Sequence, residues 1–169
     1  MKTGENVIIA LALLANLWFV SSCNNGPKRE VWLDEVYKDS CFVQDWGIPQ
    51  INQSVVWTPL TVNGVVYKRG IGAHSISRML YDLGGKAVSV SGLVGADDNN
   101  LYAGKLQFKI SGDKKELWKS GVMRKGDPVK EFNVSLSGID KVLLLVEECG
   151  DGIMYDHADW LNVKFVTHG

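Results

Sequence analysis

The stretch Lys105-Leu106-Gln107-Phe108-Lys109-Ile110 alternates polar and apolar side chains. Successive side chains of a β-strand point to opposite faces of its sheet, so this pattern predicts a strand with one face in a core and the other toward water. Trp160-Leu161-Asn162-Val163-Lys164-Phe165 repeats the alternation near the C-terminus. Helical periodicity is scarce in the rest of the chain, and we therefore expect an all-β protein.

Further runs rich in strand-forming residues lie at 79–83, 87–93, 129–136 and 142–146. The last run is uniformly apolar, which predicts a central strand covered on both faces. Asn63-Gly64 separates two short apolar runs and predicts a two-residue hairpin, because both central residues of such a turn must accept positive φ. Many short strands with regular turns are typical of a β-sandwich or a barrel.

Length and composition narrow the class of protein further. The chain has 169 residues, which favours one domain, and its 46% hydrophobic and 22% charged content excludes a wholly disordered chain. Lys and Arg number 18 against 19 Asp and Glu, so a basic nucleic-acid-binding surface is not expected. Only three histidines are present, against a histidine-rich metal cage, whereas six tryptophans supply aromatic surface.

The first residues have the character of an export signal. Residues 7–20 are apolar except for Asn16, a run shorter than the roughly 20 residues of a membrane-spanning helix. Val20-Ser21-Ser22-Cys23 resembles the lipobox of bacterial lipoproteins. That resemblance implies removal of residues 1–22, lipidation of Cys23 and a tether over 23–29. We expect an exported protein, lipid-anchored in a bacterial cell membrane or outer membrane; an ordinary cleaved signal is the alternative.

Two further cysteines, Cys41 and Cys149, remain. Export into oxidising conditions would allow them to form a disulfide. Pairing requires that the first and last strands be neighbours, which the sequence leaves open. Two buried free thiols are the alternative.

The segment Tyr67-Lys68-Arg69-Gly70-Ile71-Gly72-Ala73-His74-Ser75 concentrates unusual residues. It lacks the third glycine and the following helix of a dinucleotide-binding fingerprint. Gly70 and Gly72 instead indicate a tight bend or a close backbone approach at a strand end. His74 either donates a hydrogen bond to a ligand hydroxyl or ties a loop to a neighbouring strand.

Two polar clusters are candidates for chemistry. Asp97-Asp98-Asn99-Asn100 offers four oxygen-bearing side chains, which suit a hard cation such as calcium or else a solvated turn. Asp156, His157 and Asp159 must form a buried polar network or line a loop site, because unpaired buried charges are costly. His157 and Asp159 have too few partners for a zinc site.

Hydrolase chemistry has weak support in the sequence. A Ser–His–Asp triad is defined by space rather than order, but no Gly-x-Ser-x-Gly elbow is present and neither Ser75 nor Ser77 stands in a strained turn. Paired carboxylates for glycoside hydrolysis stay open. A domain of this size leaves little mass for a deep catalytic cleft.

The aromatic residues give another lead. Sugars present apolar C–H faces and a ring of hydroxyls, and a site for them needs an aromatic platform with a few placed polar groups. Trp160 opens an alternating strand, so we expect it in the core. Trp46 and Trp57 flank an expected loop at 47–53 and are better surface candidates.

Four ordered motifs carry a resemblance to a known family. They are Tyr67 to Ser75, Tyr81-Asp82-Leu83-Gly84-Gly85, Val94-Gly95-Ala96-Asp97-Asp98, and Asp151-Gly152 with Asp156-His157-Ala158-Asp159-Trp160. Over roughly residues 31–166 the chain resembles the NPCBM domain, which overlaps carbohydrate-binding module family 51. The resemblance implies a galactose-binding-domain-like β-sandwich (jelly roll) over residues 30–167, often with structural calcium. It also implies non-catalytic glycan recognition, with galactose-type sugars among the targets and glycoside hydrolases as neighbours.

The motif positions carried over from the family are Gly72, His74, Asp97, Asp98, Asp156, His157 and Trp160.

We therefore expect a membrane-anchored lipoprotein that binds carbohydrate without catalysis. His74, Asp98 and His157 would bond sugar hydroxyls, and Trp46 or Trp57 would stack on the ring. Asp97 and Asp156 are the candidate calcium ligands. The alternatives are a protein-interaction or scaffold lipoprotein that keeps the sandwich without a sugar site, and a minimal glycoside hydrolase.

Overall fold

The computed structural model describes residues 27–102 and 104–168 of the chain. The expected leader at 1–22, the expected lipidation site Cys23 and most of the expected tether lie outside these residues. Within the part of the chain that is described, no helix is long and apolar enough to cross a membrane.

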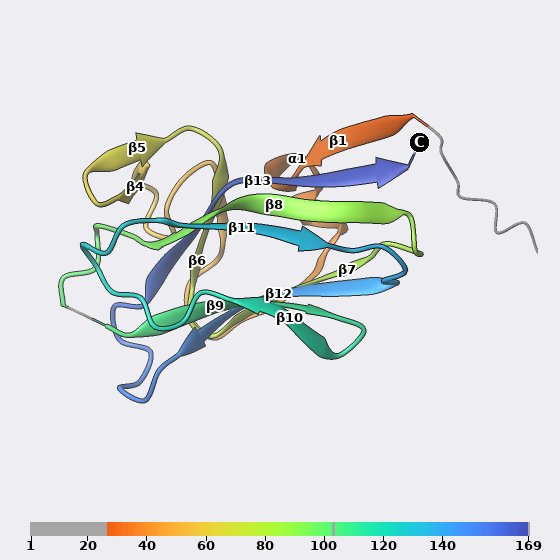
Figure 1. Cartoon of the computed structure of the whole chain (residues 1–169). Coiled ribbons are helices and arrows are strands. Elements are labelled where there is room, and N and C mark those ends of the chain that lie inside the picture. Colours follow the sequence, from red (N-terminus) through yellow and green to blue (C-terminus); the bar gives the residue numbers. More distant parts are fainter. Residues whose placement is uncertain (1–26, 103, 169) are drawn as a thin grey trace, which may run out of the picture.

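The stretch around Phe108 forms strand β9 (Leu106–Gly112), in which every second residue is buried, as the alternation predicts. This strand belongs to a five-stranded antiparallel sheet (Figure 1). The order of its strands is β10 (Lys115–Lys119), β9, β12 (Lys141–Glu148), β7 (Ser77–Asp82) and β2 (Cys41–Gln44).

The apolar run at 142–146 lies in β12, at the centre of this sheet, as expected. Val142, Leu144 and Val146 point into the core. Leu143, on the opposite face, is only half-buried and lines a surface groove with Leu80. The predicted cover on both faces therefore holds at Leu145, which is buried, and fails at Leu143, because the second sheet packs on one face only.

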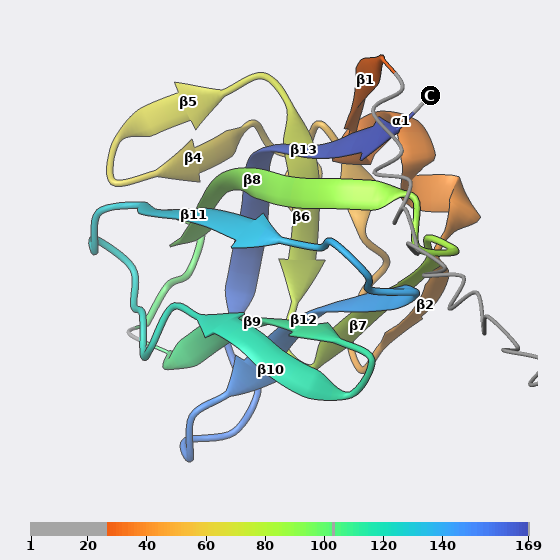
Figure 2. The same cartoon turned by 45° about the vertical axis from the view of Figure 1, so that its right-hand side comes forward.

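The second sheet is organised around the long strand β13 (His157–His168) (Figures 1 and 2). One edge of β13 pairs with β8 (Ala87–Ala96), and the other pairs first with β6 (Gly70–His74) and then with β1 (Lys28–Trp32). Two outer strands complete the sheet, β11 (Lys130–Ser135) beside β8 and β3 (Gln50–Ile51) beside β6.

Strand β1 begins inside the segment predicted as a tether. Lys28 and Arg29 pair with His168 and Thr167 of β13, so their backbone groups are ordered by the sheet. A four-residue helix α1 (Leu33–Val36) and a 3₁₀ turn η1 (Tyr37–Asp39) then lead into β2.

The Asn63-Gly64 pair forms the predicted hairpin turn between β4 (Leu60–Val62) and β5 (Val65–Tyr67). Asn63 has φ 50° and Gly64 has φ 78°. Both central residues thus take the positive φ that this turn requires.

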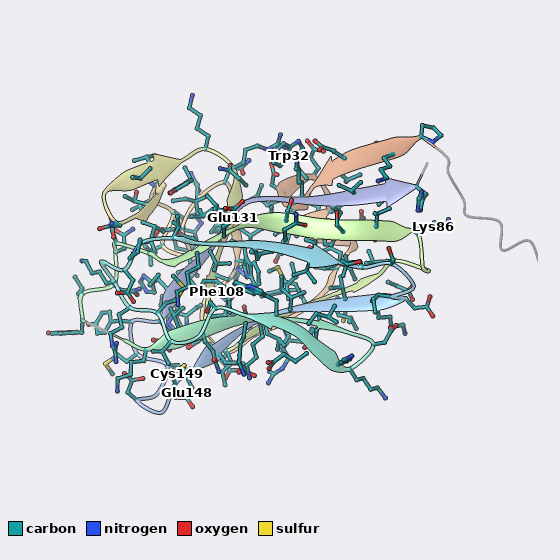
Figure 3. All side chains as sticks on the ribbon, viewed as in Figure 1. Trp32, Lys86, Phe108, Glu131, Glu148 and Cys149 are labelled. Atoms are coloured by element: carbon teal, nitrogen blue, oxygen red, sulfur yellow. The ribbon has the colours of Figure 1, made fainter. Side chains whose placement is uncertain are left out.

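Trp160 lies at the centre of the core between the two sheets, as predicted, and is fully buried. Its ring is nearly perpendicular to Phe108 of the opposite sheet at 5.1 Å and to Phe132 at 5.9 Å. Figure 3 shows Phe108 between the two layers. Edge-to-face pairs of this kind contribute about 0.5–1.5 kcal/mol beyond the area that they bury.

Cys41 and Cys149 are both free, so the disulfide that the sequence left open does not form. Cys41 is level with Leu80 of β7, and Leu80 in turn faces Leu143 of β12. Cys149 lies six residues after Leu143, directly after the end of β12. At the rise per residue of a strand, this places Cys149 about 20 Å further along. The expectation of buried thiols is wrong at Cys41, which is exposed on an edge strand.

Gly72 allows the close backbone approach that the sequence indicates, although it does so inside a strand rather than at its end. A Cβ at this position would lie 2.3 Å from the carbonyl oxygen of Gln53. The Gly72 N–H donates to that carbonyl at 3.1 Å. The missing side chain therefore lets the loop after β3 pack directly on β6.

Candidate functional site

The site is built on two histidines that face each other across a strand pair. The antiparallel register of β6 and β13 places His74 opposite His157. Their ring centroids are 5.5 Å apart, and both residues are buried. Directly opposed residues of an antiparallel pair carry their side chains on the same face, which explains this proximity.

Trp46 covers the two imidazoles from the loop between β2 and β3. Its ring is parallel to His157 within 6° at 5.8 Å and tilted over His74 at 4.8 Å. Gln44 holds this loop in place, because its Nε2 donates to the Trp46 carbonyl at 2.6 Å while its Oε1 accepts from the His74 N–H at 3.0 Å. Trp46 is nevertheless 48% exposed, so its ring remains open to a ligand.

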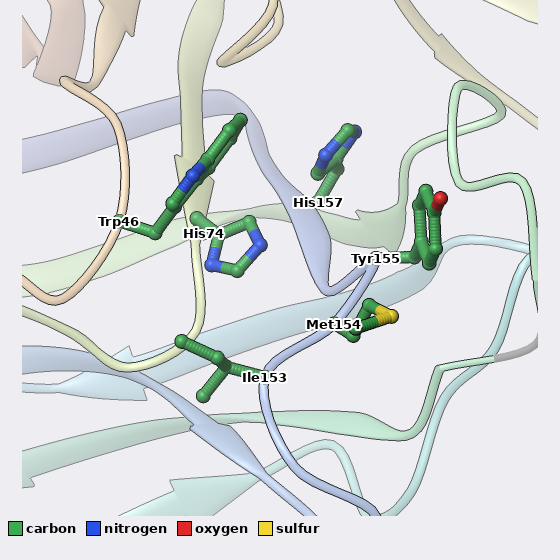
Figure 4. Close-up of a pocket in the computed structure, with 6 residues that line it drawn as sticks. All are labelled: Trp46, His74, Ile153, Met154, Tyr155 and His157. Carbon is green, nitrogen blue, oxygen red and sulfur yellow. The ribbon is translucent and has the colours of Figure 1, made fainter.

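The three rings and a stretch of the loop between β12 and β13 line a pocket of about 420 Å³. Figure 4 shows its six lining side chains, with Ile153, Met154 and Tyr155 beside the histidines and Trp46. No carboxylate belongs to this lining. Ile153 and Met154 were not predicted as site residues; their only signal in the sequence is an apolar pair inside a glycine-rich, acidic loop.

Both imidazoles are held in the neutral form. Burial lowers the pKa of His74, and the bond from its ring to the Ser75 carbonyl opposes that shift only in part. Burial also lowers the pKa of His157. The Nδ1 of His74 lies 2.5 Å from the Ser75 carbonyl, and the Nδ1 of His157 has no partner among the described residues. A neutral imidazole carries one N–H donor and one acceptor nitrogen. The Nδ1–H of His74 donates to the Ser75 carbonyl, so its Nε2 is left as an acceptor for a ligand hydroxyl.

Two of the predicted sugar contacts, Asp98 and Trp57, lie outside the six residues that line this pocket. The Asp98 carboxylate accepts from the N–H groups of Asn63 at 3.0 Å and Gly64 at 2.7 Å. It therefore holds the β4–β5 hairpin turn, whose positive φ values turn both N–H groups toward it. Trp57 is exposed on the loop before β4.

The segment 97–100 contains the expected turn at residues 98–99, where Asp97 Oδ1 accepts from the Asn99 N–H at 2.7 Å, but its two ends are buried rather than solvated. Asp97 and Asn100 are both buried. The side chain of Asn100 accepts from the His157 N–H at 2.8 Å and donates to the His157 carbonyl at 2.9 Å. Asn100 thereby satisfies both backbone groups of His157 at the start of β13 and fixes the position of this residue.

Asp156 is tied to the other side of the pocket. The Ser75 hydroxyl donates to its Oδ2 at 2.5 Å. Burial raises the pKa of Asp156 to about 6, with the Ser75 bond opposing the shift and the charges of Asp151 and Glu148 adding to it. Ser75 is itself buried, and its hydroxyl donates its hydrogen bond to an aspartate rather than to a histidine. Among the described residues, Ser75 is therefore not the nucleophile of a Ser–His–Asp triad.

Among the described acidic residues, Asp159 has the surroundings that best suit a hard cation such as calcium. This carboxyl is fully buried, and neither of its oxygens has a partner among the described residues. Burial and the neighbouring Asp97 raise its pKa well above the usual range. Two close buried carboxylates either share a proton or hold a cation, and an all-oxygen donor set suits calcium. Asp156 does not share this position, because the charges beside it are Asp151 and Glu148.

Among the described residues no group of three or more His, Cys, Asp and Glu side chains is arranged to hold a metal ion. A calcium ion at Asp159 would therefore take the rest of its ligands from backbone carbonyls, amide side chains or water.

The sandwich and its end-on pocket are typical of small binding modules. Residues 29–166 match the model of the NPCBM/NEW2 domain family, and the chain belongs to that family. It is 31% identical over 130 residues to alpha-1,3-galactosidase B of Akkermansia muciniphila, a match that covers 75% of this chain and 16% of that protein. The chain thus spans about a sixth of the curated relative.

Solved structures agree with the fold. The family 51 carbohydrate-binding module of a Clostridium perfringens family 95 glycoside hydrolase, solved with methyl-galactose, has a TM-score of 0.74 at 26% identity. That similarity covers 81% of this chain and 99% of the module. A second module of the same bacterium, solved with GlcNAc, shares the fold at 23% identity, a TM-score of 0.74 and coverage of 82% and 32%. The expected galactose-binding-like β-sandwich is confirmed.

The raised pKa of Asp156 makes a testable prediction. Between the ordinary pKa near 3.8 and about 6, the folded protein holds a proton that the unfolded chain has released, so stability falls as the pH rises through this window. Asp156→Asn cannot ionise and still accepts from Ser75. We therefore compare the melting temperatures of the variant and the wild type by circular dichroism. The difference in favour of Asp156→Asn should be larger at pH 8 than at pH 4.

The exposed Asp82→Asn variant controls for the change in net charge. An equal difference in melting temperature at both pH values for Asp156→Asn would contradict this account of the buried carboxyl.

Proposed function

We propose that this protein is a non-catalytic carbohydrate-binding module and that its sugar site is the pocket under Trp46. The observation that carries this proposal is the half-exposed Trp46 ring, stacked on His157 and held by Gln44. An aromatic face binds the apolar C–H face of a sugar ring, and the neutral His74 and His157 supply bonds to its hydroxyls.

Galactose-type sugars are the proposed ligands. The family 51 module bound to methyl-galactose aligns over nearly its whole length, and the curated relative is an alpha-1,3-galactosidase. We propose that the protein works beside a glycoside hydrolase, because the matching region is a small part of that relative.

The arrangement of the acidic residues supports binding without catalysis. Glycoside hydrolysis uses two carboxyl groups that face one bond of the substrate. Asp156 and Asp159 are buried, Asp98 holds the hairpin turn, and the pocket lining contains no carboxylate.

Substitution of Trp46 tests the proposed site. We expect Trp46→Ala to weaken the binding of methyl α-galactoside at least about 10-fold in isothermal titration calorimetry, because a central aromatic contact is lost. Trp57→Ala removes a tryptophan outside the pocket and should bind like the wild type.

Both variants should keep the wild-type circular dichroism spectrum, since neither ring is in the core. If the folded wild-type protein binds no sugar on a broad glycan array, the carbohydrate proposal is contradicted and a protein-interaction role for the sandwich is favoured.

We also propose a structural calcium ion, held by Asp159 together with Asp97 beside the start of β13. Bound there, the ion would neutralise two buried carboxylates and stabilise the loop that positions His157. The support for this proposal is the pair of unpartnered oxygens of the fully buried Asp159.

Thermal unfolding in calcium and in chelator tests this cation. We expect calcium to raise the melting temperature relative to EDTA, because an ion that binds only the folded state stabilises it. Asp159→Asn should lose this response, and His74→Ala should keep it. Identical melting curves of the wild type in calcium and in EDTA would show that the two aspartates share a proton instead.

We further propose that Cys23 is lipidated and anchors the protein in a bacterial membrane. The fold bears on the orientation that such an anchor would give, because Lys28 of β1 pairs with His168 at the far end of β13 from His157. Twelve strand residues span up to about 36 Å, so an N-terminal anchor would leave the pocket facing away from the membrane.

Metabolic labelling with a clickable fatty acid tests this anchor. The wild type should carry the label and partition into detergent, whereas Cys23→Ala should remain unlabelled with its leader uncleaved. Wild-type levels of label on Cys23→Ala would refute the lipobox interpretation.

A further inference from the structure

A second aromatic surface continues the pocket outward. Tyr155 lines the pocket from the loop before β13, and Tyr102 lies against it from the loop between β8 and β9. The two ring centroids are 4.9 Å apart in an edge-to-face arrangement. Tyr102 is 68% exposed and contributes little to the core, so its ring offers a free apolar surface beside the pocket.

The two loops that carry these rings are clasped together. Gly104 lies so close to the second loop that a Cβ would be 2.5 Å from Asp156 Oδ1 and 2.8 Å from the Tyr155 carbonyl oxygen. The Cys149 N–H donates to the Lys105 carbonyl at 2.8 Å. These contacts hold residues 104 and 105 against the pocket loop, and the Tyr102 ring meets Tyr155 without a ligand present. An arrangement that is formed before binding reduces the entropy lost on binding.

Two charged side chains next to these loops bond within the protein. Glu148 accepts from the N–H groups of Gly150 and Gly152, at 2.6 Å and 3.3 Å. Lys105 lies 3.9 Å from the Asp151 carboxylate. The side chains placed here are the two tyrosine rings and the exposed Met154, whose apolar surfaces suit the apolar face of a sugar ring.

We propose that Tyr102 and Tyr155 form a second sugar subsite, so that the protein recognises a neutral oligosaccharide rather than a single terminal sugar. This inference rests on the proposed function. The terminal ring occupies the pocket under Trp46, and the next ring packs on the Tyr102 and Tyr155 pair. The second subsite adds affinity for a longer glycan without any further hydrogen-bonding group in the pocket.

Calorimetry with matched ligands and variants tests the subsite. The probes are methyl α-galactoside and two disaccharides, galactosyl-α-1,3-galactose and lactose. We expect the wild type to bind at least one disaccharide about 10-fold more tightly than the methyl galactoside. Tyr102→Ala should remove this gain and leave methyl galactoside affinity within twofold of the wild type.

Two controls isolate the tyrosine ring. Tyr102→Phe keeps the aromatic face and should retain the disaccharide gain. Leu101→Ala removes a neighbouring side chain that is 70% exposed and should also retain it. Circular dichroism of each variant reports its folding.

Three results would overturn the subsite while leaving the pocket intact. They are equal wild-type affinity for the disaccharides and the methyl galactoside, an equal loss for both ligand types in Tyr102→Ala, and a loss in Leu101→Ala as large as in Tyr102→Ala. Absence of wild-type binding to all three sugars would instead contradict the proposed function, and the subsite with it.

Discussion

The register of β13 against β6 and β8 is the constraint on which both the core and the site depend. The pairing that sets His157 opposite His74 also sets Trp160 opposite Ile71 and Val94, with its ring directed at Phe108. A shift of one residue would turn every side chain of β13 to the other face. The hydrophobic core therefore maintains the geometry of the pocket, because the burial of Trp160 opposes any such shift.

Buried polar groups position the site without lining it. Asn100 closes both backbone groups of His157, and Gln44 joins His74 to the loop of Trp46. Asp156 serves the turn after His74 through Ser75. Each of these bonds satisfies a buried polar group, and a buried group left unpaired costs about 1–3 kcal/mol. The pairing gives each loop a defined position, and the histidines stay neutral as a result of the same burial.

The sandwich places the start of the described chain and the candidate site at opposite ends. Strand β1 pairs with the C-terminal end of β13 (Figure 1), whereas His157 lies at the N-terminal end of β13, with His74 and Trp46 beside it. The loops at this second end carry Trp46 and Tyr155, and the strands beneath them hold the loops in place. A binding surface on a rigid scaffold is the usual division in β-sandwiches, because loops vary without disturbing the core.

The sequence by itself determined the features that arise from neighbouring residues. Alternation predicted β9 and the burial of Trp160, and Asn63-Gly64 predicted its hairpin, because side-chain direction and backbone φ are local properties. Residue type also singled out His74, His157 and Trp46. Only the tertiary structure decided that these three meet, that Asp98 bonds the turn of a hairpin, and that Cys41 and Cys149 lie apart. Strand order and register bring together residues distant in the chain, and no local pattern encodes them.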